Sequence, residues 1–318
     1  MPWRRPWAEA LSLGGLGRSV WSKPYLLLVV TTLIWGGNAV AARLAVGELS
    51  PMVLVTMRWL IAVAVLAAFV RPSRDEMRIV GRHWLATLVM ATLGFTAFNA
   101  MFYVAAETTT AVNIGMIQGT MPGLVLIGSF LAYGTPIGRA QVIGLGVALV
   151  GIAVVVSRGH LETLLSARFV AGDLWMVAAS VLYAGYGVAL QRRPAVRPLV
   201  FFAVLAISAF ATSVPLLAWE IAAGRAVWPG PKGWAILAFV GLFPSLLSQI
   251  TFIRGIEMIG PGRASLFINL VPVFAALLAV VILGERFGLY HAAALALVLG
   301  GIWMAERGRR PPASIDRA

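Results

Sequence analysis

Ten long apolar runs constrain the fold of this chain more than any other feature. A transmembrane helix needs about 20 consecutive, mostly apolar residues, and each run comes close to that length. The runs cover residues 25–46, 51–70, 84–105, 111–133, 138–157, 171–190, 199–219, 234–253, 263–282 and 287–305. They predict an all-α, polytopic membrane protein with ten transmembrane helices.

The composition agrees with this prediction. Of the 318 residues, 60% are hydrophobic and only 12% are charged, whereas soluble domains have about 25% charged residues. The mean hydropathy is +0.90. Since the loops between the apolar runs are short, they leave no room for a separate soluble domain. We expect one membrane domain whose surface contacts the lipid bilayer.

The distribution of basic residues predicts the orientation. The net charge is +13, and most of the Lys and Arg residues fall in loops that ten crossings place on one side. This positive-inside asymmetry predicts that both termini are cytoplasmic, with tails at residues 1–23 and 307–318. It indicates a membrane protein and gives no reason to expect a nucleic-acid partner.

The chain repeats itself at an offset of about 150 residues. The matched pairs include Phe102 with Phe252, Glu107 with Glu257, and Pro122 with Pro272, and at an offset of 148 Trp35 with Tyr183 and Asn38 with Tyr186. The repeats predict two halves of five helices, residues 24–157 and 171–306, joined by a periplasmic connector at residues 158–170. Because five is odd, the second half enters the membrane from the other side. Inverted repeats of this kind are typical of transporters that bind substrate near the midplane.

Polar residues inside the apolar runs predict where a substrate would bind. Trp35 and Asn38 share a helix face, and their counterparts Tyr183 and Tyr186 share another. Such a paired aromatic and polar set favours a cavity for a small polar molecule, although helix-to-helix hydrogen bonding would need the same residues. The full set of candidate substrate-binding residues is Trp35, Asn38, Asn99, Tyr103, Tyr183, Tyr186, Gln249 and Asn269. Asn113 and Gln118 rank lower, because about 140° of helix rotation separates them.

Two prolines interrupt apolar runs and are candidate hinges. Pro122 and Pro272 each remove a helix hydrogen bond, which produces either a hinge or a static kink. The three glycines beside the first proline, at positions 115, 119 and 123, favour close helix packing.

Charged residues within the runs leave alternatives open. Arg58 lies about seven residues into the second run, where it either anchors the helix by reaching the interface or Glu48 or binds an anion. Arg43 is similarly ambiguous. We expect no carboxylate deep in a span, and Glu107 and Glu257 near the two surfaces. Proton coupling therefore has no support at this level.

No motif points to a cofactor, a metal or catalysis. The chain has no cysteine, which excludes disulfides and thiol chemistry, and it lacks the glycine-rich phosphate loop of ATPases. The three histidines, His83, His160 and His291, lie on different segments. An integral-membrane enzyme would need acid and base groups that converge on its substrate, so we expect no catalytic residues, no cofactor and no metal ligands.

Three segments resemble a known family. The stretches "IWGGNAVAARLA" (34–45), "SPMVLVTMRWLIA" (50–62) and "INLVPVFAALLAVVILGERFGLYHAAALALVLGGI" (268–302) are similar to the ten-helix EamA branch of the drug/metabolite transporter superfamily. The resemblance implies a carrier of the bacterial inner membrane, often an exporter of amino acids or related metabolites. It also implies a central cavity lined by the first, third and fourth helices of each half. One departure is that "YGTPIGR" (133–139) lacks the acidic residue of "LGERFG" (283–288).

The sequence thus favours a secondary or facilitative transporter that moves small polar metabolites by alternating access. A translocator of lipid-linked or phospholipid-like substrates is the alternative within transport. It would need a lateral opening lined with arginine, and Arg43 and Arg58 are the residues that could supply one. The oligomeric state cannot be read from the sequence, since glycine-rich helices pack within a monomer as readily as between monomers.

Overall fold

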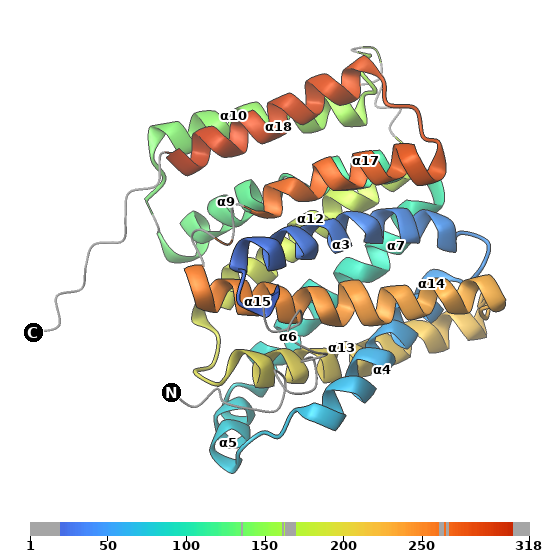
Figure 1. The fold of residues 1–318 in the computed structure, drawn as a ribbon, viewed down its shortest axis with the longest axis vertical. Coiled ribbons are helices and arrows are strands. Elements are labelled where there is room, and N and C mark those ends of the chain that lie inside the picture. The colour runs from blue at the N-terminus through green and yellow to red at the C-terminus, as the bar shows by residue number, and fades with distance from the viewer. Residues whose placement is uncertain are drawn as a thin grey trace, which may run out of the picture.

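A computed structural model describes residues 20–307, except 135, 161, 163–169, 261–263 and 265–266. Most of the two predicted tails and of the predicted connector lie outside the described residues. Throughout the described part of the chain the regular structure is helical, without a β-strand (Figure 1).

Ten helical segments correspond to the ten predicted spans. They are α3 (Pro24–Ala45), α4 (Pro51–Phe69), α6–η1–α7 (Trp84–Thr108), α8 with α9 (Ala111–Gln118 and Met121–Tyr133), α10 (Arg139–Val156), α12 (Ala171–Ala189), α13 (Pro198–Ala222), α14–η3–α15 (Pro231–Ile259), η4–α17 (Phe267–Leu283) and α18 (Leu289–Arg307). Seven are long and apolar enough to cross a membrane, and the other three are shorter apolar helices. The all-α polytopic fold is confirmed.

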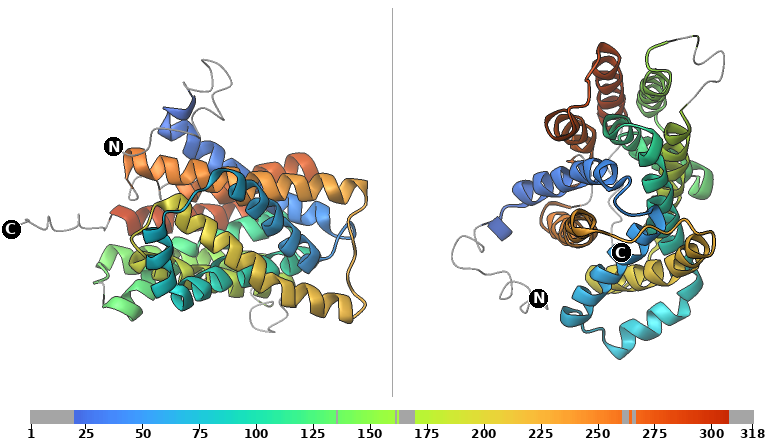
Figure 2. Two further views of the ribbon diagram at one scale, coloured as in Figure 1. Left: turned by 90° about the horizontal axis from the view of Figure 1, so that it is seen from below. Right: turned by 90° about the vertical axis from the view of Figure 1, so that its right-hand side faces the viewer.

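The helix contacts follow the two-fold relation expected of inverted repeats. The helix pairs α10–α18, α4–α13 and α8–α17 each join one position in the first half to the equivalent position in the second. Similarly, α3 packs against α15 and α17, while its counterpart α12 packs against α7 and α9. Figure 1 and the two views of Figure 2 show α10 and α18 side by side at one edge of the bundle, with α4 and α13 at the opposite edge.

The bundle has two ends that differ in chemistry. We call the end with loop 46–50 and the start of α12 the Glu220 end, which lies at the right in Figure 1. The opposite end, where α3 begins and α18 ends, is called the Glu76 end. It also holds α5 (Arg74–Arg82), a short amphipathic helix that the sequence analysis treated as a loop. The Ser73 hydroxyl accepts a hydrogen bond from the Glu76 N–H, while the Glu76 carboxylate accepts one from the Ser73 N–H, which forms a capping box at the start of α5.

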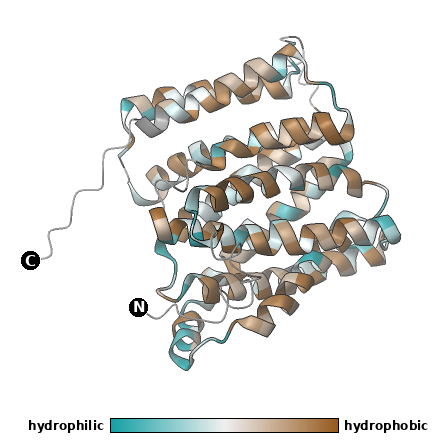
Figure 3. Ribbon diagram, in the orientation of Figure 1, coloured by the Kyte–Doolittle hydropathy of each residue, from teal (hydrophilic) through white to brown (hydrophobic). Residues whose placement is uncertain are grey.

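The outer surface is suited to lipid. Large apolar side chains lie exposed along the spans, for example Leu131 at 76% and Val281 at 71%. These two residues occupy equivalent positions in the two halves. Figure 3 shows apolar residues along the helices and hydrophilic residues mostly at the helix ends. Without a bilayer, such side chains would expose a large apolar area to water.

Four spans are not continuous α-helices, which the hydropathy pattern did not predict. The third span contains a π-helical turn, η1 (Thr92–Ala97), and the eighth contains η3 (Phe243–Leu247) at the equivalent position. The fourth span is interrupted between α8 and α9, and the ninth begins its regular helix only after the 3₁₀ turn η4 (Phe267–Leu270). Discontinuous helices of this kind are typical of transporter binding sites.

The two candidate hinge prolines stand at these interruptions. Pro122 and Pro272 are each the second residue of a helix, α9 and α17 respectively. At this position a proline leaves no helix hydrogen bond unmade. Each of these helices ends at a glycine, Gly134 or Gly284, with φ of +65°, a conformation that glycine adopts without a steric penalty. The prolines therefore restart an interrupted helix, and their hinge role stays a prediction.

Glycines bring the fourth and ninth spans into close contact. A Cβ added to Gly115 would lie 2.2 Å from the Ala275 Cβ, and one added to Gly119 would lie 3.1 Å from Pro272. A side chain at Gly115 would require α17 to shift, whereas one at Gly119 would require its neighbours to move by only a few tenths of an ångström. The close-packing role expected for these glycines is thus what the structure shows.

Candidate functional site

A cavity of about 230 Å³ lies between the two halves, near the middle of the spans. It is lined from α3, α4, η1, α7 and the α8–α9 span of the first half, and from α12, η3, α15 and the η4–α17 span of the second. These include the first, third and fourth helices of each half, with α4 in addition. Of the predicted site residues, Trp35, Asn38, Asn99, Tyr183, Gln249 and the candidate hinge Pro122 line this cavity.

Four predicted residues lie beside the cavity and do not line it. The Tyr103 hydroxyl donates a hydrogen bond to the Asn38 Oδ1 at 3.1 Å, so it stands behind a lining residue. The Tyr186 ring packs against Phe95 at 5.4 Å between ring centroids. Asn269 lies in η4, and its Oδ1 is buried without a hydrogen-bond partner. Pro272 follows the lining residue Val271, and Ser265, expected on the face of Asn269, lies outside the described residues.

Arg58 is a central polar residue of the site. It is 3% exposed and lines the cavity. Its Nε donates to the Ser245 Oγ at 2.7 Å, and its Nη1 donates to the Asn99 Oδ1 at 2.5 Å and to the Tyr103 hydroxyl. The anchors that the sequence suggested are not the ones found, because Arg58 is buried away from the interface and Glu48 instead pairs with Lys232 at 2.9 Å.

The position of Ser245 follows from the sequence of its helix. Pro244 has no N–H, so the carbonyl of Val240 four residues earlier lacks its helical donor. The Ser245 hydroxyl donates to this carbonyl at 2.7 Å. Its oxygen is thereby oriented to accept from Arg58. The π turn at η3 thus positions a neutral hydrogen-bond acceptor for Arg58, and π turns are frequent at functional sites.

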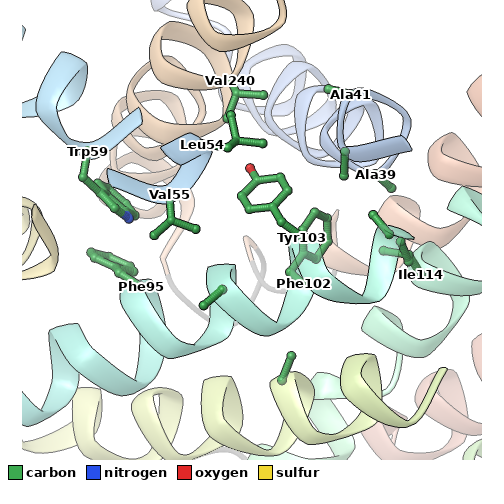
Figure 4. Close-up of a cluster of buried hydrophobic side chains, with 14 of the residues drawn as sticks. Ala39, Ala41, Leu54, Val55, Trp59, Phe95, Phe102, Tyr103, Ile114 and Val240 are labelled. Atoms are coloured by element: carbon green, nitrogen blue, oxygen red, sulfur yellow. The ribbon is translucent and has the colours of Figure 1, made fainter. Parts of the chain in front are cut away.

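Aromatic rings form much of the cavity wall. Trp59 stacks on Phe95 at 4.8 Å between centroids, and Phe98 packs against Tyr183 at 4.9 Å. Figure 4 shows Trp59 of α4 facing Phe95, and the Tyr103 ring pointing from α7 toward Leu54 and Val240. The sequence analysis named Trp35 and Tyr183 for this wall but not Trp59 or the phenylalanines, whose apolar setting resembles that of ordinary core residues.

Asn113 and Gln118 point to different places, as the helix rotation between them requires. Gln118 lines the cavity, whereas the Asn113 Nδ2 donates to the Asp173 Oδ1 at 3.1 Å. Asp173 is fully buried and also accepts from the Thr109 hydroxyl. Asp173 is the third residue of α12, and Glu220, which is 6% exposed, is the third residue from the end of α13. Both carboxylates are thus buried in protein near a helix end and do not lie deep in a span.

Carboxylates of the second half hold helix N-termini of the first half at the Glu220 end. Glu220 accepts from the Ser50 hydroxyl at 2.5 Å and from the N–H groups of Met52 and Val53 at 3.3 and 3.2 Å. In the same way, Glu285 accepts from the N–H groups of Ala111 and Val112, at 2.9 and 3.1 Å. A negative charge at a helix N-terminus is stabilising. These contacts tie α4 and α8 to the second half.

Other charged residues have structural partners. Arg43 donates to the Ala106 carbonyl near the end of α7. Glu107 and Glu257 are exposed, as expected of residues near the surfaces. His291 is buried, and its Nδ1 accepts from the Gly288 N–H at 3.0 Å. Among the described residues, no group of three or more His, Cys, Asp or Glu could hold a metal ion.

Comparison with known proteins identifies a matching family. The model of the EamA-like transporter family matches residues 22–157 and again residues 170–306. The two matches coincide closely with the two halves of the bundle.

Full-length relatives are transporters without an assigned substrate. The chain is 27% identical to the uncharacterized transporter YyaM of Bacillus subtilis over 302 residues, which cover 91% of this chain and 95% of YyaM. It is 26% identical to an uncharacterized transporter of Archaeoglobus fulgidus, over 89% of this chain and 97% of that one. The uncharacterized inner membrane transporter YedA of Escherichia coli K12 is 23% identical, with 87% and 88% covered.

A solved crystal structure has the same fold. It aligns with a TM-score of 0.61 at 22% sequence identity and covers 89% of this chain and 98% of its own.

Proposed function

The chain belongs to the EamA-like transporter family, and from this premise we propose that it is a secondary or facilitative carrier of small polar metabolites. Transport itself follows from the family and from the relatives, which also argue against an enzyme. The observation that supports the mechanism is the cavity at the interface of the two inverted halves. In such an architecture, substrate binds near the midplane while the halves rock to expose it to either side.

The proposed location is the bacterial inner membrane with both termini cytoplasmic. The basic residues of the Glu76 end support this orientation, and the name of the relative YedA refers to an inner membrane. The Glu220 end then faces the periplasm. Because carboxylates tie the two halves together at that end, the closed side would be the periplasmic one.

The proposed substrates are amino acids or their derivatives, and the proposed direction is export. Both rest on the family resemblance. The cavity supports a small substrate, because its volume of about 230 Å³ is below the roughly 300–1,000 Å³ of pockets for drug-sized ligands. A lipid-like substrate has less support, since Arg58 is buried inside the bundle and does not line a lateral opening.

Counterflow in liposomes tests the proposal. The purified protein is reconstituted, loaded with pooled amino acids and N-acylated amino acids, and assayed for uptake of labelled substrates. We expect exchange by the wild type and its loss in Asn38→Leu, which removes a polar group from the cavity. Val281→Ala serves as the control, because this residue faces outward at 71% exposure. Lack of exchange for every pooled compound, with a folded protein, would contradict the substrate class.

A further inference from the structure

The cavity has a positive charge without a counter-charge. Arg58 is its one charged lining residue among those that the structure describes, and no aspartate or glutamate lines it. The three hydrogen-bond acceptors of Arg58 are Ser245, Asn99 and Tyr103, all neutral. No described carboxylate oxygen lies within 4.0 Å of a nitrogen of the Arg58 guanidinium.

One nitrogen of the guanidinium remains available. The described protein groups accept from Nε and from Nη1, and none of them accepts from Nη2. Nη2 is also not fully enclosed, and Arg58 lines the cavity, so a ligand there can accept from this nitrogen. A buried charge without a counter-charge is costly, and a ligand that brings an oxyanion would remove that cost. Arginine presents a planar pair of donors that suits a carboxylate or a similar anion.

The rest of the cavity indicates what else the ligand contains. Rings of Trp35, Trp59 and Phe95 supply apolar wall, and Asn38 and Gln249 supply amide groups. The wall thus suits an apolar or aromatic body with limited polar substitution. An ammonium group would find no carboxylate there and would lie in the same small cavity as the Arg58 charge.

From this geometry we infer that the cavity selects amphipathic organic anions, with the anionic group bound at Arg58, over zwitterions and cations of the same shape. The inference rests on the proposed function in that it takes this cavity as the substrate site. It deepens the proposal by favouring derivatives that lack a free ammonium group, such as N-acylated amino acids or aromatic acids, over free amino acids.

Three probes with one common body test the charge preference. 3-Phenylpropionate is an anion, phenylalanine is a zwitterion and phenethylamine is a cation at pH 7. Binding to the protein in nanodiscs is measured by calorimetry. We expect 3-phenylpropionate to bind about 10- to 100-fold more tightly than phenylalanine, because the ammonium group of phenylalanine would be buried without a carboxylate partner, and phenethylamine to bind least. Equal affinity for the three probes, or no binding of 3-phenylpropionate, would overturn the inference.

Variants then assign the preference to Arg58. We expect Arg58→Gln to lose the preference for the anion, and Arg58→Lys, which keeps the charge, to retain part of it. Arg43→Gln is the matched control, because Arg43 donates to a backbone carbonyl outside the cavity. A purely structural role would weaken binding of all three probes alike. If Arg58→Gln does not fold, wild type and Arg58→Lys are compared instead. If the affinity ratios among the three probes are the same in both proteins, the guanidinium does not select the anion.

Transport separates failure of this inference from failure of the proposed function. Labelled 3-phenylpropanesulfonate is used for counterflow because it stays charged and does not cross the bilayer by itself. Selective anion binding without counterflow of any probe would leave the anion site standing and refute the carrier. Counterflow of phenylalanine that is indifferent to Arg58→Gln would support the carrier and refute the anion site.

Discussion

At the scale of single residues, the position of Arg58 in the cavity depends on the backbone N–H that Pro244 lacks. Pro244 cannot donate to the Val240 carbonyl, the Ser245 hydroxyl does so at 2.7 Å, and the same oxygen accepts from Arg58. Replacing the serine removes both interactions and leaves a buried carbonyl and a guanidinium N–H without a partner. The cost of such unsatisfied groups is about 1–3 kcal/mol.

We therefore expect Ser245→Ala to lower the thermal stability of the detergent-solubilised protein and to weaken anion binding, but less than the loss of Arg58 does. Ser213→Ala is the matched control. Ser213 is also fully buried, but its hydroxyl donates only to the Phe210 carbonyl of its own helix. Melting curves of the two variants check the prediction, and equal losses of stability would count against a special role for Ser245.

The sequence predicted individual residues of the site better than it predicted their partners. The three-residue spacing of Trp35 and Asn38, and the repeat that links Asn99 with Gln249, follow from patterns within about 150 residues of chain, and these residues line the cavity. Arg58 was ambiguous because its acceptors belong to the third and eighth spans, which only the folded bundle brings together. Hydropathy alone cannot separate an arginine at the interface from one enclosed by neutral acceptors.

At the scale of elements, α5 is joined to α13 by one strong ion pair. The Arg197 Nε donates to the Glu76 Oε1 at 2.7 Å, and its Nη2 donates to Oε2 at 2.8 Å. These hydrogen bonds lower the pKa of Glu76 to about 2 from its usual 4.5. A carboxyl group with a lowered pKa in the folded state stabilises the fold fully above pH 4.5, and this contribution is lost as the pH falls toward 2.

Glu76→Gln should accordingly destabilise the protein at pH 7 by only about 0.5–1 kcal/mol, because Arg197 is nearly half exposed to solvent. The difference between wild type and variant should shrink below pH 4.5. Thermal unfolding in detergent at a series of pH values measures it. Asp75→Asn is the control, since the ion pair of Asp75 with Arg78 is longer, at 3.4 Å, and highly exposed. A difference that stays constant down to pH 3 would contradict the assignment to Glu76.

The sequence also predicted the spans better than their interruptions. Ten apolar runs gave ten helical segments, because a lipid-facing helix must be apolar over most of its length. A π turn or a 3₁₀ turn changes the backbone hydrogen bonds without changing hydropathy, so η1, η3 and η4 left no trace in the pattern. The visible signals were three prolines, Pro122, Pro244 and Pro272, and the sequence analysis used the first and the third. The short helix α5 was missed because its polar sequence resembles a loop.

At the scale of the whole molecule, the two inverted halves are not chemically equivalent. Asp173, Glu220 and Glu285 of the second half bind polar groups of the first half at the Glu220 end. At the corresponding positions of the first half, Tyr25 replaces Asp173 and Thr135 replaces Glu285, and α4 holds no acidic residue. The missing acidic residue was visible in the sequence as "YGTPIGR" against "LGERFG". The sequence did not show which group Glu285 binds, because the α8 N-terminus lies more than 170 residues away in the chain.

This asymmetry predicts that Glu285 favours the conformation that is closed at the Glu220 end. Removing its charge from the α8 N-terminus destabilises the closed conformation by about 1–2 kcal/mol. This corresponds to a roughly 5- to 30-fold increase in the ratio of open to closed protein. The chain has no cysteine, so Val112→Cys introduces a single thiol at a position that is fully buried in the closed state. We expect an impermeant maleimide to label this thiol slowly in intact cells and several-fold faster when Glu285→Ala is added.

Glu107→Ala controls for the loss of a carboxylate at the same end, because Glu107 is exposed and lies outside these contacts. It should leave the labelling rate unchanged. In the proposed rocking motion, Glu285 and the α8 N-terminus would separate when the Glu220 end opens, so the loss of this contact favours the open conformation. The ion pair of Glu76 and Arg197 lies at the opposite end. Labelling that is equally fast with and without Glu285 would mean that this contact does not hold the closed state. An increase confined to Glu285→Ala would mean that the charge difference between the two repeats biases the carrier toward one side of the membrane.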